Sequence, residues 1–195
     1  MISTEQKFLR ATEQPLERTL IDIVRATARR FPEAEAIDDG EVVVTYAELI
    51  NEIDSTATWL YEQGIRRGDR IGVRMPSGNR ELYLAILSIM AAGAAYVPVD
   101  ADDPDERAEM VFGEAGIAGY FDAEGLHLAG SAARNRPCPL DSDTDSGEYS
   151  DAADAEVEAM PPSAREIISQ EPTPDDDCWI IFTSGSTGKP KGVAV

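Results

Sequence analysis

Apolar residues in the first quarter of the chain follow helical spacing and then strand spacing. Between Thr19 and Phe31 they recur near helical intervals, and Pro32 disfavours helix in the residue before it, so we expect a short amphipathic helix here. Two short apolar runs follow at 36–37 and 42–44, separated by a stretch that contains an Asp-Gly pair. A pair of this kind between two such runs is typical of a β-hairpin.

A longer helix is predicted from Thr45 to about Gly64. Thr45-Tyr46-Ala47-Glu48 has the Thr-x-x-Glu form of a capping box, in which the two side chains satisfy free backbone N–H groups of the first turn. Gly64 supplies a stop, because glycine readily adopts the backbone conformation that ends a helix. The expected buried stripe consists of Leu49, Ile53, Ala57, Leu60 and Tyr61.

Strands and helices then alternate. We expect a strand over 69–75, a loop over 76–79, a helix over 81–92 and a strand over 94–100. The helix is apolar nearly all round, so it should pack on both sides. Pro98 has no backbone N–H, which predicts a strand end or a sheet edge at this position.

A last helix and strand complete this region. Pro104 fits the first position of a helix that runs to about Ala115 and stops at Gly116, and a short strand is expected over 117–122. Strands that alternate with helices pair in parallel through crossover connections. We therefore predict an α/β fold with a mostly parallel sheet in residues 1–122.

The periodic pattern dissolves over 123–177, which we interpret as an acidic loop or linker. From Asp141 to Cys178 there are thirteen acidic residues and one basic residue, Arg165. Such a segment has little to bury and favours a solvated loop. A docking segment for a basic partner is the alternative that stays open.

Composition points to a globular protein. Hydrophobic residues make up 43% of the 195 residues, which is enough for a core, and the formal net charge is -20. That charge disfavours nucleic acid and anionic membranes as general surface partners, because their phosphates would be repelled. The first residues lack the apolar stretch of a signal peptide, and no apolar run approaches membrane-spanning length, so we expect a cytoplasmic protein.

Cysteine and histidine usage disfavours a metal site built from nitrogen and sulfur ligands. Cys138 and Cys178 lie far apart, without a further thiol or histidine at ligand spacing, and are expected to be reduced thiols. The single histidine, His127, lies in a polar stretch and is expected to be a surface residue.

The end of the chain carries the strongest candidate site. An apolar run over 178–182 leads into hydroxyl, glycine and lysine residues, and a second apolar run follows at 193–195. Glycine lets backbone N–H groups approach an anion, while the hydroxyls and lysines add donors and charge, so the pattern predicts a phosphate-binding loop between two buried strands. The sequence of this segment, from position 183 to 192, is Thr183, Ser184, Gly185, Ser186, Thr187, Gly188, Lys189, Pro190, Lys191 and Gly192.

This segment is not a Walker A loop. That loop requires glycine where Thr183 stands, a magnesium-binding hydroxyl where Pro190 stands, and a helix afterwards. A flexible Ser/Gly linker is also a poor description, because a linker would not end in Pro-Lys-Gly between two apolar runs.

The same residues resemble the phosphate loop of the adenylate-forming superfamily, whose members use ATP to activate carboxylic acids as acyl-AMP. The Thr-Ser-Gly-Ser-Thr-Gly-x-Pro-Lys-Gly pattern is met at every fixed position from Thr183 to Gly192. Two upstream elements, Val44–Leu49 and Ala92–Asp100, resemble the amino-acid-activating branch, the adenylation domains of nonribosomal peptide synthetases, although Ala91 replaces a lysine. The stretch 98–107 is also similar to synthetases of amino-acid homopolymers.

The resemblance implies the first part of the large N-terminal domain of such an enzyme, with the chain truncated within it. It implies activation of an amino acid as aminoacyl-AMP and transfer to the phosphopantetheine thiol of a carrier-protein domain, with ATP and Mg²⁺ as cofactors. By the same resemblance the residues that bind the ATP phosphates are Thr183, Ser184, Gly185, Ser186, Thr187, Gly188 and Lys191. Lys189 occupies the variable position of the pattern, and the catalytic residues are unknown.

The two upstream elements are expected to cap a helix and to pack in the core rather than to catalyse. The chain divides into 1–122, 123–177 and 178–195, and is expected to be inactive alone, because the remaining motifs of the superfamily have no counterpart in it. The alternatives are a fragment of an acyl- or aryl-acid CoA ligase and a non-catalytic nucleotide-binding module.

Overall fold

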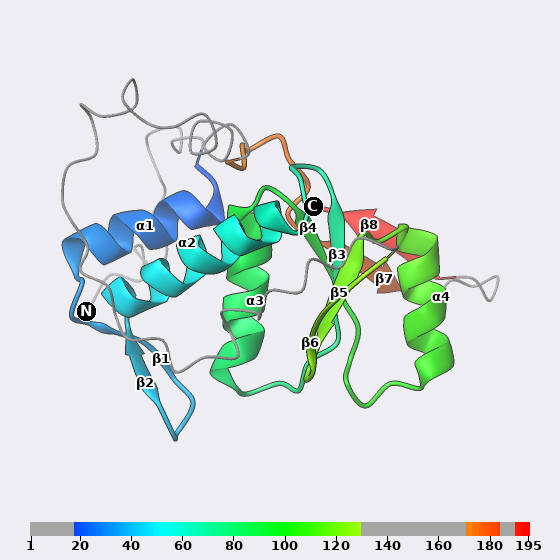
Figure 1. Ribbon diagram of the computed structural model, residues 1–195, viewed down its shortest axis with the longest axis horizontal. Coiled ribbons are helices and arrows are strands. Elements are labelled where there is room, and N and C mark those ends of the chain that lie inside the picture. The colour runs from blue at the N-terminus through cyan, green and yellow to red at the C-terminus, as the bar shows by residue number, and fades with distance from the viewer. Residues whose placement is uncertain (1–17, 130–170, 184–189) are drawn as a thin grey trace, which may run out of the picture.

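The computed structural model describes residues 18–129, 171–183 and 190–195, and Figure 1 shows their arrangement. It confirms the predicted helices and most of the predicted strands. In chain order the elements are α1 (Leu20–Arg30), β1 (Glu35–Asp38), β2 (Val43–Thr45), α2 (Tyr46–Glu62), β3 (Arg70–Val73), α3 (Arg80–Ala91), β4 (Ala95–Pro98), α4 (Asp105–Ala115), β5 (Gly119–Asp122), β6 (Gly125–Leu128), β7 (Ile180–Thr183) and β8 (Lys191–Ala194).

The main sheet has the strand order β4-β3-β5-β6. Strand β3 pairs in parallel with β4 and with β5, so Ile71 lies opposite both Tyr96 and Gly119. Helices α3 and α4 are the crossover connections, which confirms the predicted α/β architecture. Strands β1 and β2 form a separate antiparallel hairpin, as the Asp-Gly turn predicts.

Helices cover both faces of this sheet, with α3 on one side and α4 on the other (Figure 1). Side chains of the strands point alternately to the two faces of the sheet. Ile71 packs on the face covered by α2 and α3, and Val97 packs on the face covered by α4. Helix α3 also contributes to a second cluster with α1 and α2, so it is packed on two sides as its apolar sequence predicts. Pro98 is the last residue of β4, in agreement with its missing N–H.

Strand β6 was not expected from the sequence, which predicted a loop from residue 123 onward. A short turn instead returns the chain antiparallel to β5, with Asp122 opposite Gly125. His127, expected to be a surface residue, has a side chain that is 38% exposed; its ring stacks on Tyr120 at 4.7 Å and its Nε2 lies 2.9 Å from Asp122 Oδ1. Leu126 and Leu128 alternate with His127 and pack against the core, so the prediction missed a short apolar alternation; cross-strand contacts with β5 add to the stability of β6.

Helix caps explain most element boundaries. The predicted capping box at Thr45 is present, and α1 has a second one at Thr19, which the sequence pattern did not reveal. Asn79 caps α3, and Gly116 ends α4 with a left-handed backbone, φ 62°. Pro104 is a correction: it occupies the cap position before α4 rather than the first helical position, and it supplies no side-chain cap.

Membrane-spanning helices and metal-binding clusters are both absent from the described residues. No helix there is long and apolar enough to cross a membrane. No group of three or more histidine, cysteine, aspartate or glutamate side chains in the same residues could hold a metal ion.

Candidate functional site

The predicted phosphate loop is bracketed by an antiparallel hairpin. Strands β7 and β8 pair from Ile180 opposite Ala194 to Thr183 opposite Lys191. The predicted site residues Thr183 and Lys191 therefore face each other at the loop end of the hairpin, as the last and first residues of their strands. The other predicted site residues, Ser184, Gly185, Ser186, Thr187 and Gly188, lie outside the described residues.

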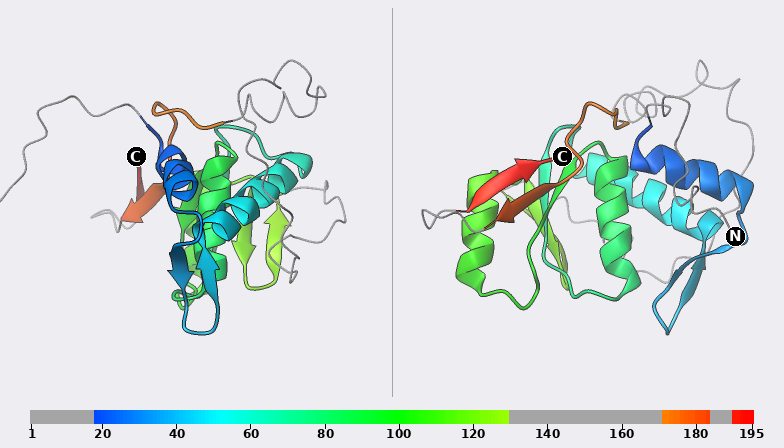
Figure 2. Two further views of the ribbon diagram at one scale, coloured as in Figure 1. Left: turned by 90° about the vertical axis from the view of Figure 1, so that its left-hand side faces the viewer. Right: turned by 180° about the vertical axis from the view of Figure 1, so that it is seen from behind.

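The hairpin lies beside the main sheet. Trp179 forms a parallel bridge with Tyr96, and the Tyr96 N–H donates to the Cys178 carbonyl at 3.2 Å. Because β7 runs in the same direction as β4, Thr183 lies toward the carboxyl ends of the parallel strands. Figure 2 shows the hairpin next to α4. The carboxyl edge of such a sheet is the usual place for ligands in open α/β folds.

The two strands of the hairpin differ in burial. Ile180 of β7 is buried among Val97 and Val111, whereas all four residues of β8 are exposed. The expectation of two buried strands was therefore wrong for β8. Its apolar residues resemble a core strand in the sequence, but within the described residues β8 pairs only with β7.

Gly192, the last glycine of the motif, has a packing role. A Cβ at this position would meet the Phe182 ring at 3.0 Å and the Ile180 Cγ2 at 3.2 Å. These contacts are tighter than ordinary van der Waals separations, so a side chain here would push the ring away. Glycine at 192 therefore lets the Phe182 ring pack against the hairpin backbone without displacement.

The side chains at the ends of the loop are accessible. Thr183 and Lys191 are both exposed, and their places opposite each other bring one hydroxyl and one ammonium group to the mouth of the loop. An ammonium group and a hydroxyl are the donors that phosphate oxygens accept from. The pair therefore suits an anionic ligand held between the strand ends.

Cys178 lies directly before β7 and is a free thiol in the structure. It is partly buried against the apolar cluster that contains Leu84 and Met90. Burial raises the pKa of the Cys178 thiol, which disfavours a reactive thiolate. Cys138, the other cysteine, lies outside the described residues.

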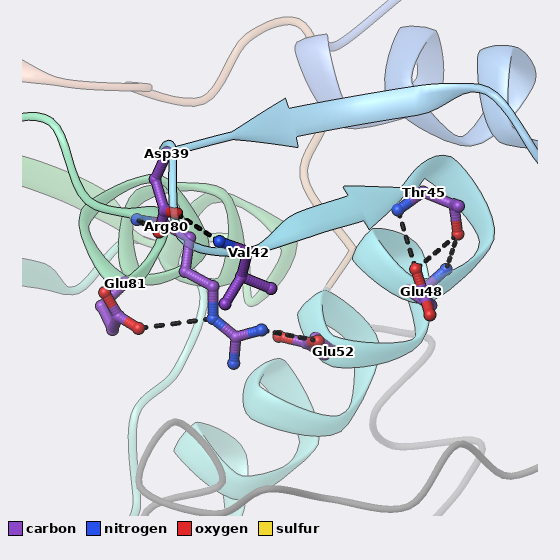
Figure 3. Close-up of polar contacts among 7 residues, drawn as sticks. All are labelled: Asp39, Val42, Thr45, Glu48, Glu52, Arg80 and Glu81. Atoms are coloured by element: carbon purple, nitrogen blue, oxygen red, sulfur yellow. Dashed lines mark hydrogen bonds and ion pairs between the residues drawn. The ribbon is translucent and has the colours of Figure 1, made fainter.

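The upstream element at Val44–Leu49 acts as a helix cap. Thr45 N donates to Glu48 Oε2 at 2.8 Å, and Glu48 N donates to Thr45 Oγ1 at 3.3 Å (Figure 3). The hydrogen bonds that Glu48 accepts, from the Thr45 backbone first and then from its hydroxyl, lower the pKa of Glu48. The capping expectation is confirmed.

Arg80 organises a polar cluster next to this cap that the sequence did not reveal (Figure 3). Its Nε lies 3.3 Å from Glu81 Oε1, its Nη1 lies 3.7 Å from Glu52 Oε1, and its backbone N–H donates to Asp39. Asp39 also accepts from the Val42 and Glu41 N–H groups, and these hydrogen bonds lower its pKa. The cluster joins the β1–β2 turn to α2 and α3, far from β7 in Figure 1, and therefore has a structural role.

The AMP-binding enzyme family matches residues 24–195. The chain belongs to that family. It is 33% identical over 190 residues to a subunit of the linear gramicidin synthase of Brevibacillus parabrevis, an alignment that covers 94% of this chain and 3% of that protein. It is also 33% identical to vanchrobactin synthetase VabF of Vibrio anguillarum, covering 97% of this chain and 6% of that protein.

Solved structures give the same assignment. The N-terminal subdomain of Klebsiella oxytoca NpsA in complex with 3-hydroxyanthranilyl-AMSN matches with a TM-score of 0.65 and 26% identity, covering 92% of this chain and 40% of that one. The nonribosomal peptide synthetase FmoA3 in its AMPPNP-bound form matches with a TM-score of 0.69 and 29% identity, covering 94% and 18%. The predicted resemblance to peptide-synthetase adenylation domains is confirmed, and the chain spans less than half the length of these relatives.

Proposed function

We propose that this chain is the ATP-phosphate-binding part of an enzyme that activates an amino acid as aminoacyl-AMP in the cytoplasm. The observation that carries the proposal is the hairpin that holds the ends of the Thr-Ser-Gly-Ser-Thr-Gly-x-Pro-Lys-Gly motif, with Thr183 opposite Lys191 beside the parallel sheet. Membership of the AMP-binding family and the AMPPNP-bound relative support the nucleotide as ligand.

The proposed reaction has two steps. A carboxylate oxygen of the amino acid attacks the α-phosphorus of ATP, the bond between that phosphorus and the oxygen leading to the β-phosphorus breaks, and pyrophosphate leaves. The thiolate of a phosphopantetheine group on a carrier domain then attacks the acyl carbon and releases AMP. Such chemistry depends on positioning and on stabilisation of developing charge.

In this reaction the loop holds the β- and γ-phosphates. Hydroxyls and backbone N–H groups of the segment 183–188 donate to phosphate oxygens, and Lys191 adds a positive charge at the end of the loop. ATP enters as its Mg²⁺ complex, and the metal neutralises part of the phosphate charge. Lys189 stands at the variable position of the motif and has no assigned contact.

Activity is proposed to need more than these 195 residues. The matched relatives are many times longer than this chain. No residue of this chain is proposed to bind adenine, ribose or the side chain of the amino acid. We expect the isolated chain to show no amino-acid-dependent turnover.

The test is amino-acid-dependent exchange of labelled pyrophosphate into ATP. The assay uses the natural polypeptide that carries this chain and a panel of the twenty amino acids plus aryl acids such as anthranilate. Exchange that depends on one or a few amino acids is the expected result. Exchange with aryl acids only, followed by acyl transfer to CoA, would favour the ligase alternative, and ATP binding without exchange would favour a non-catalytic module.

A further inference from the structure

Residues 171–177, here called the strap, precede β7 by two residues and are held by two arginines from distant parts of the chain. Arg25 of α1 lies 2.8 Å from Glu171 and 2.9 Å from Asp54. Arg67, in the turn between α2 and β3, lies 2.8 Å from Asp176 Oδ2 through its Nε. The strap is the orange segment before β7 in Figures 1 and 2.

The contact between Arg67 and Asp176 is bidentate. Besides the Nε contact, Arg67 Nη2 donates to Asp176 Oδ1 at 3.0 Å, and the same Nη2 donates to Thr173 Oγ1 at 2.8 Å. Two parallel N–H donors on one carboxylate fix its orientation as well as its distance. The Asp176 side chain is 20% exposed and the Arg67 side chain 36%, so the pair lies at the surface and its strength depends on the bidentate geometry.

Asp176 also closes a turn within the strap. It accepts from Thr173 N at 2.7 Å and from Thr173 Oγ1 at 3.0 Å, while its own N–H donates to the Thr173 carbonyl at 3.0 Å. Burial of the carboxyl opposes ionisation, but the hydrogen bonds from Arg67 and Thr173 outweigh it, so the pKa of Asp176 is lowered. Arg67 therefore attaches a closed turn rather than a single side chain.

The turn that carries Arg67 is tied to the main sheet by backbone hydrogen bonds. Gly68 N donates to the Gly93 carbonyl at 2.8 Å, and Ala95 N donates to the Asp69 carbonyl at 2.9 Å. These bonds tie the turn that carries Arg67 to the amino ends of β3 and β4. Through Arg67, the strap is therefore fixed to the same edge of the main sheet.

Strand β7 is held beside β4 by the packing of Ile180 among Val97 and Val111 and by few backbone contacts. Within the described residues it has one parallel bridge to the main sheet, between Trp179 and Tyr96. Its remaining backbone partners belong to β8 and Val195, which would move with it. Burial of Ile180 helps to specify the register of β7. A single bridge adds little to it, so a restraint at the amino end of β7 also contributes to its position.

We propose that Arg67 and Asp176 are positioning residues for the phosphate loop, an inference that rests on the proposed function. The pair fixes the amino end of β7, and the loop begins at its carboxyl end, up to roughly 20 Å away along an extended chain. Neither residue contacts the nucleotide. Without the pair, the amino end of β7 loses this restraint, and the loop donors match the phosphate oxygens less well.

The test compares ATP affinity in two arginine variants of the natural polypeptide that carries this chain. Arg67→Gln removes the Arg67–Asp176 pair, here called the clamp. The control Arg107→Gln, on α4, removes the 2.7 Å pair with Asp103 and the same positive charge. Calorimetric titration measures the affinity for ATP and for the amino acid, and thermal unfolding measures stability. We expect Arg67→Gln to bind ATP about threefold to tenfold more weakly, with amino-acid affinity unchanged within twofold and Arg107→Gln like the wild type.

A double variant refines the result. Asp176→Asn should weaken ATP binding by a similar factor. The double variant Arg67→Gln with Asp176→Asn should bind ATP about as well as the weaker-binding single variant, because both substitutions remove the same ion pair. If Arg67→Gln does not fold, Arg67→Lys keeps the charge without the bidentate geometry and should show a smaller loss of ATP affinity.

Three outcomes overturn the proposal. Equal ATP affinity in Arg67→Gln and Arg107→Gln would show that the clamp does not position the loop. Equal losses of ATP and amino-acid affinity together with a lower Tm would show general destabilisation instead. A wild type that binds no ATP would contradict both the proposed function and the role of the clamp. If the wild type binds ATP and no clamp variant changes the affinity, only the role of the clamp is contradicted.

Discussion

Two glutamates one turn apart on α2 have opposite pKa shifts, and this contrast shows how position decides the role of a residue. Glu52 is partly buried; burial raises its pKa, and the nearby Glu48 and Glu81 raise it further while Arg80 lowers it. Glu48 accepts hydrogen bonds from Thr45, which lower its pKa. The capping-box pattern identifies Glu48 in the sequence, but Glu52 only acquires its environment from the fold.

These shifts predict opposite pH effects. Ionised Glu52 destabilises the folded state above its raised pKa, and this cost disappears as the pH falls toward the ordinary value of about 4.3. Glu52→Gln should therefore raise stability at pH 7 by up to about 1 kcal/mol and have no effect near pH 3. Glu48→Gln should lower stability at pH 7, with the difference lost as the pH falls through the lowered pKa of Glu48. Urea unfolding of the variants and the wild type at pH 7 and pH 3 tests both predictions. A Glu52→Gln variant that is less stable than the wild type at pH 7 would contradict the assignment for Glu52.

Gly72 on β3 shows a steric requirement. A Cβ there would lie 2.6 Å from Phe112 Cε1 and 2.8 Å from Tyr120 Cβ. Gly72→Ala should therefore lower the free energy of unfolding by about 1–3 kcal/mol. Gly113→Ala is the matched control, because nothing lies within 4 Å of its Cβ position in α4, and it should raise stability by about 0.5–1 kcal/mol. Equal effects of the two substitutions in chemical denaturation would show that the sheet and α4 are not packed this closely.

At the scale of elements, the helix caps could be predicted where a residue pattern marks them. The box at Thr45 follows the Thr-x-x-Glu pattern, while the one at Thr19 uses Asp22 and therefore escaped prediction. Strand β6 escaped prediction because its alternation is only Leu126, His127 and Leu128, too short to stand out in a polar segment without its pairing with β5. Strand β8 was wrongly predicted to be buried, because its apolar residues resemble those of a core strand although all four of its residues are exposed.

The cap gives a prediction at this scale. Thr45→Ala removes the hydroxyl that accepts from Glu48 N and should lower stability by about 1 kcal/mol. Thr27→Ala, in the interior of α1, removes only a bond to the Ile23 carbonyl and should be neutral or slightly stabilising, since alanine favours helix. Thermal unfolding of both variants decides, and a Thr45→Ala variant as stable as Thr27→Ala would mean that the box contributes nothing.

At the scale of the whole molecule, alternating periodicity was enough to predict an α/β sheet with crossover helices, and a ten-residue motif with two upstream elements was enough to predict the family. What the sequence could not show is how distant segments meet. Arg67 and Asp176 contact each other across more than a hundred positions, and neither lies in a periodic pattern. The place of the hairpin beside β4 likewise follows from the bridge between Trp179 and Tyr96, which no local signal indicates.

The most direct measurement is the ATP affinity of the natural polypeptide that carries this chain, with Lys191→Ala compared to Lys189→Ala. Both substitutions remove one lysine from the same loop, but only Lys191 stands at a fixed position of the motif and opposite Thr183. A lost charge-assisted phosphate contact predicts ATP binding about tenfold to a hundredfold weaker in Lys191→Ala, with Lys189→Ala close to the wild type. Equal ATP affinity in Lys191→Ala and the wild type would contradict the assignment of this loop as the phosphate site.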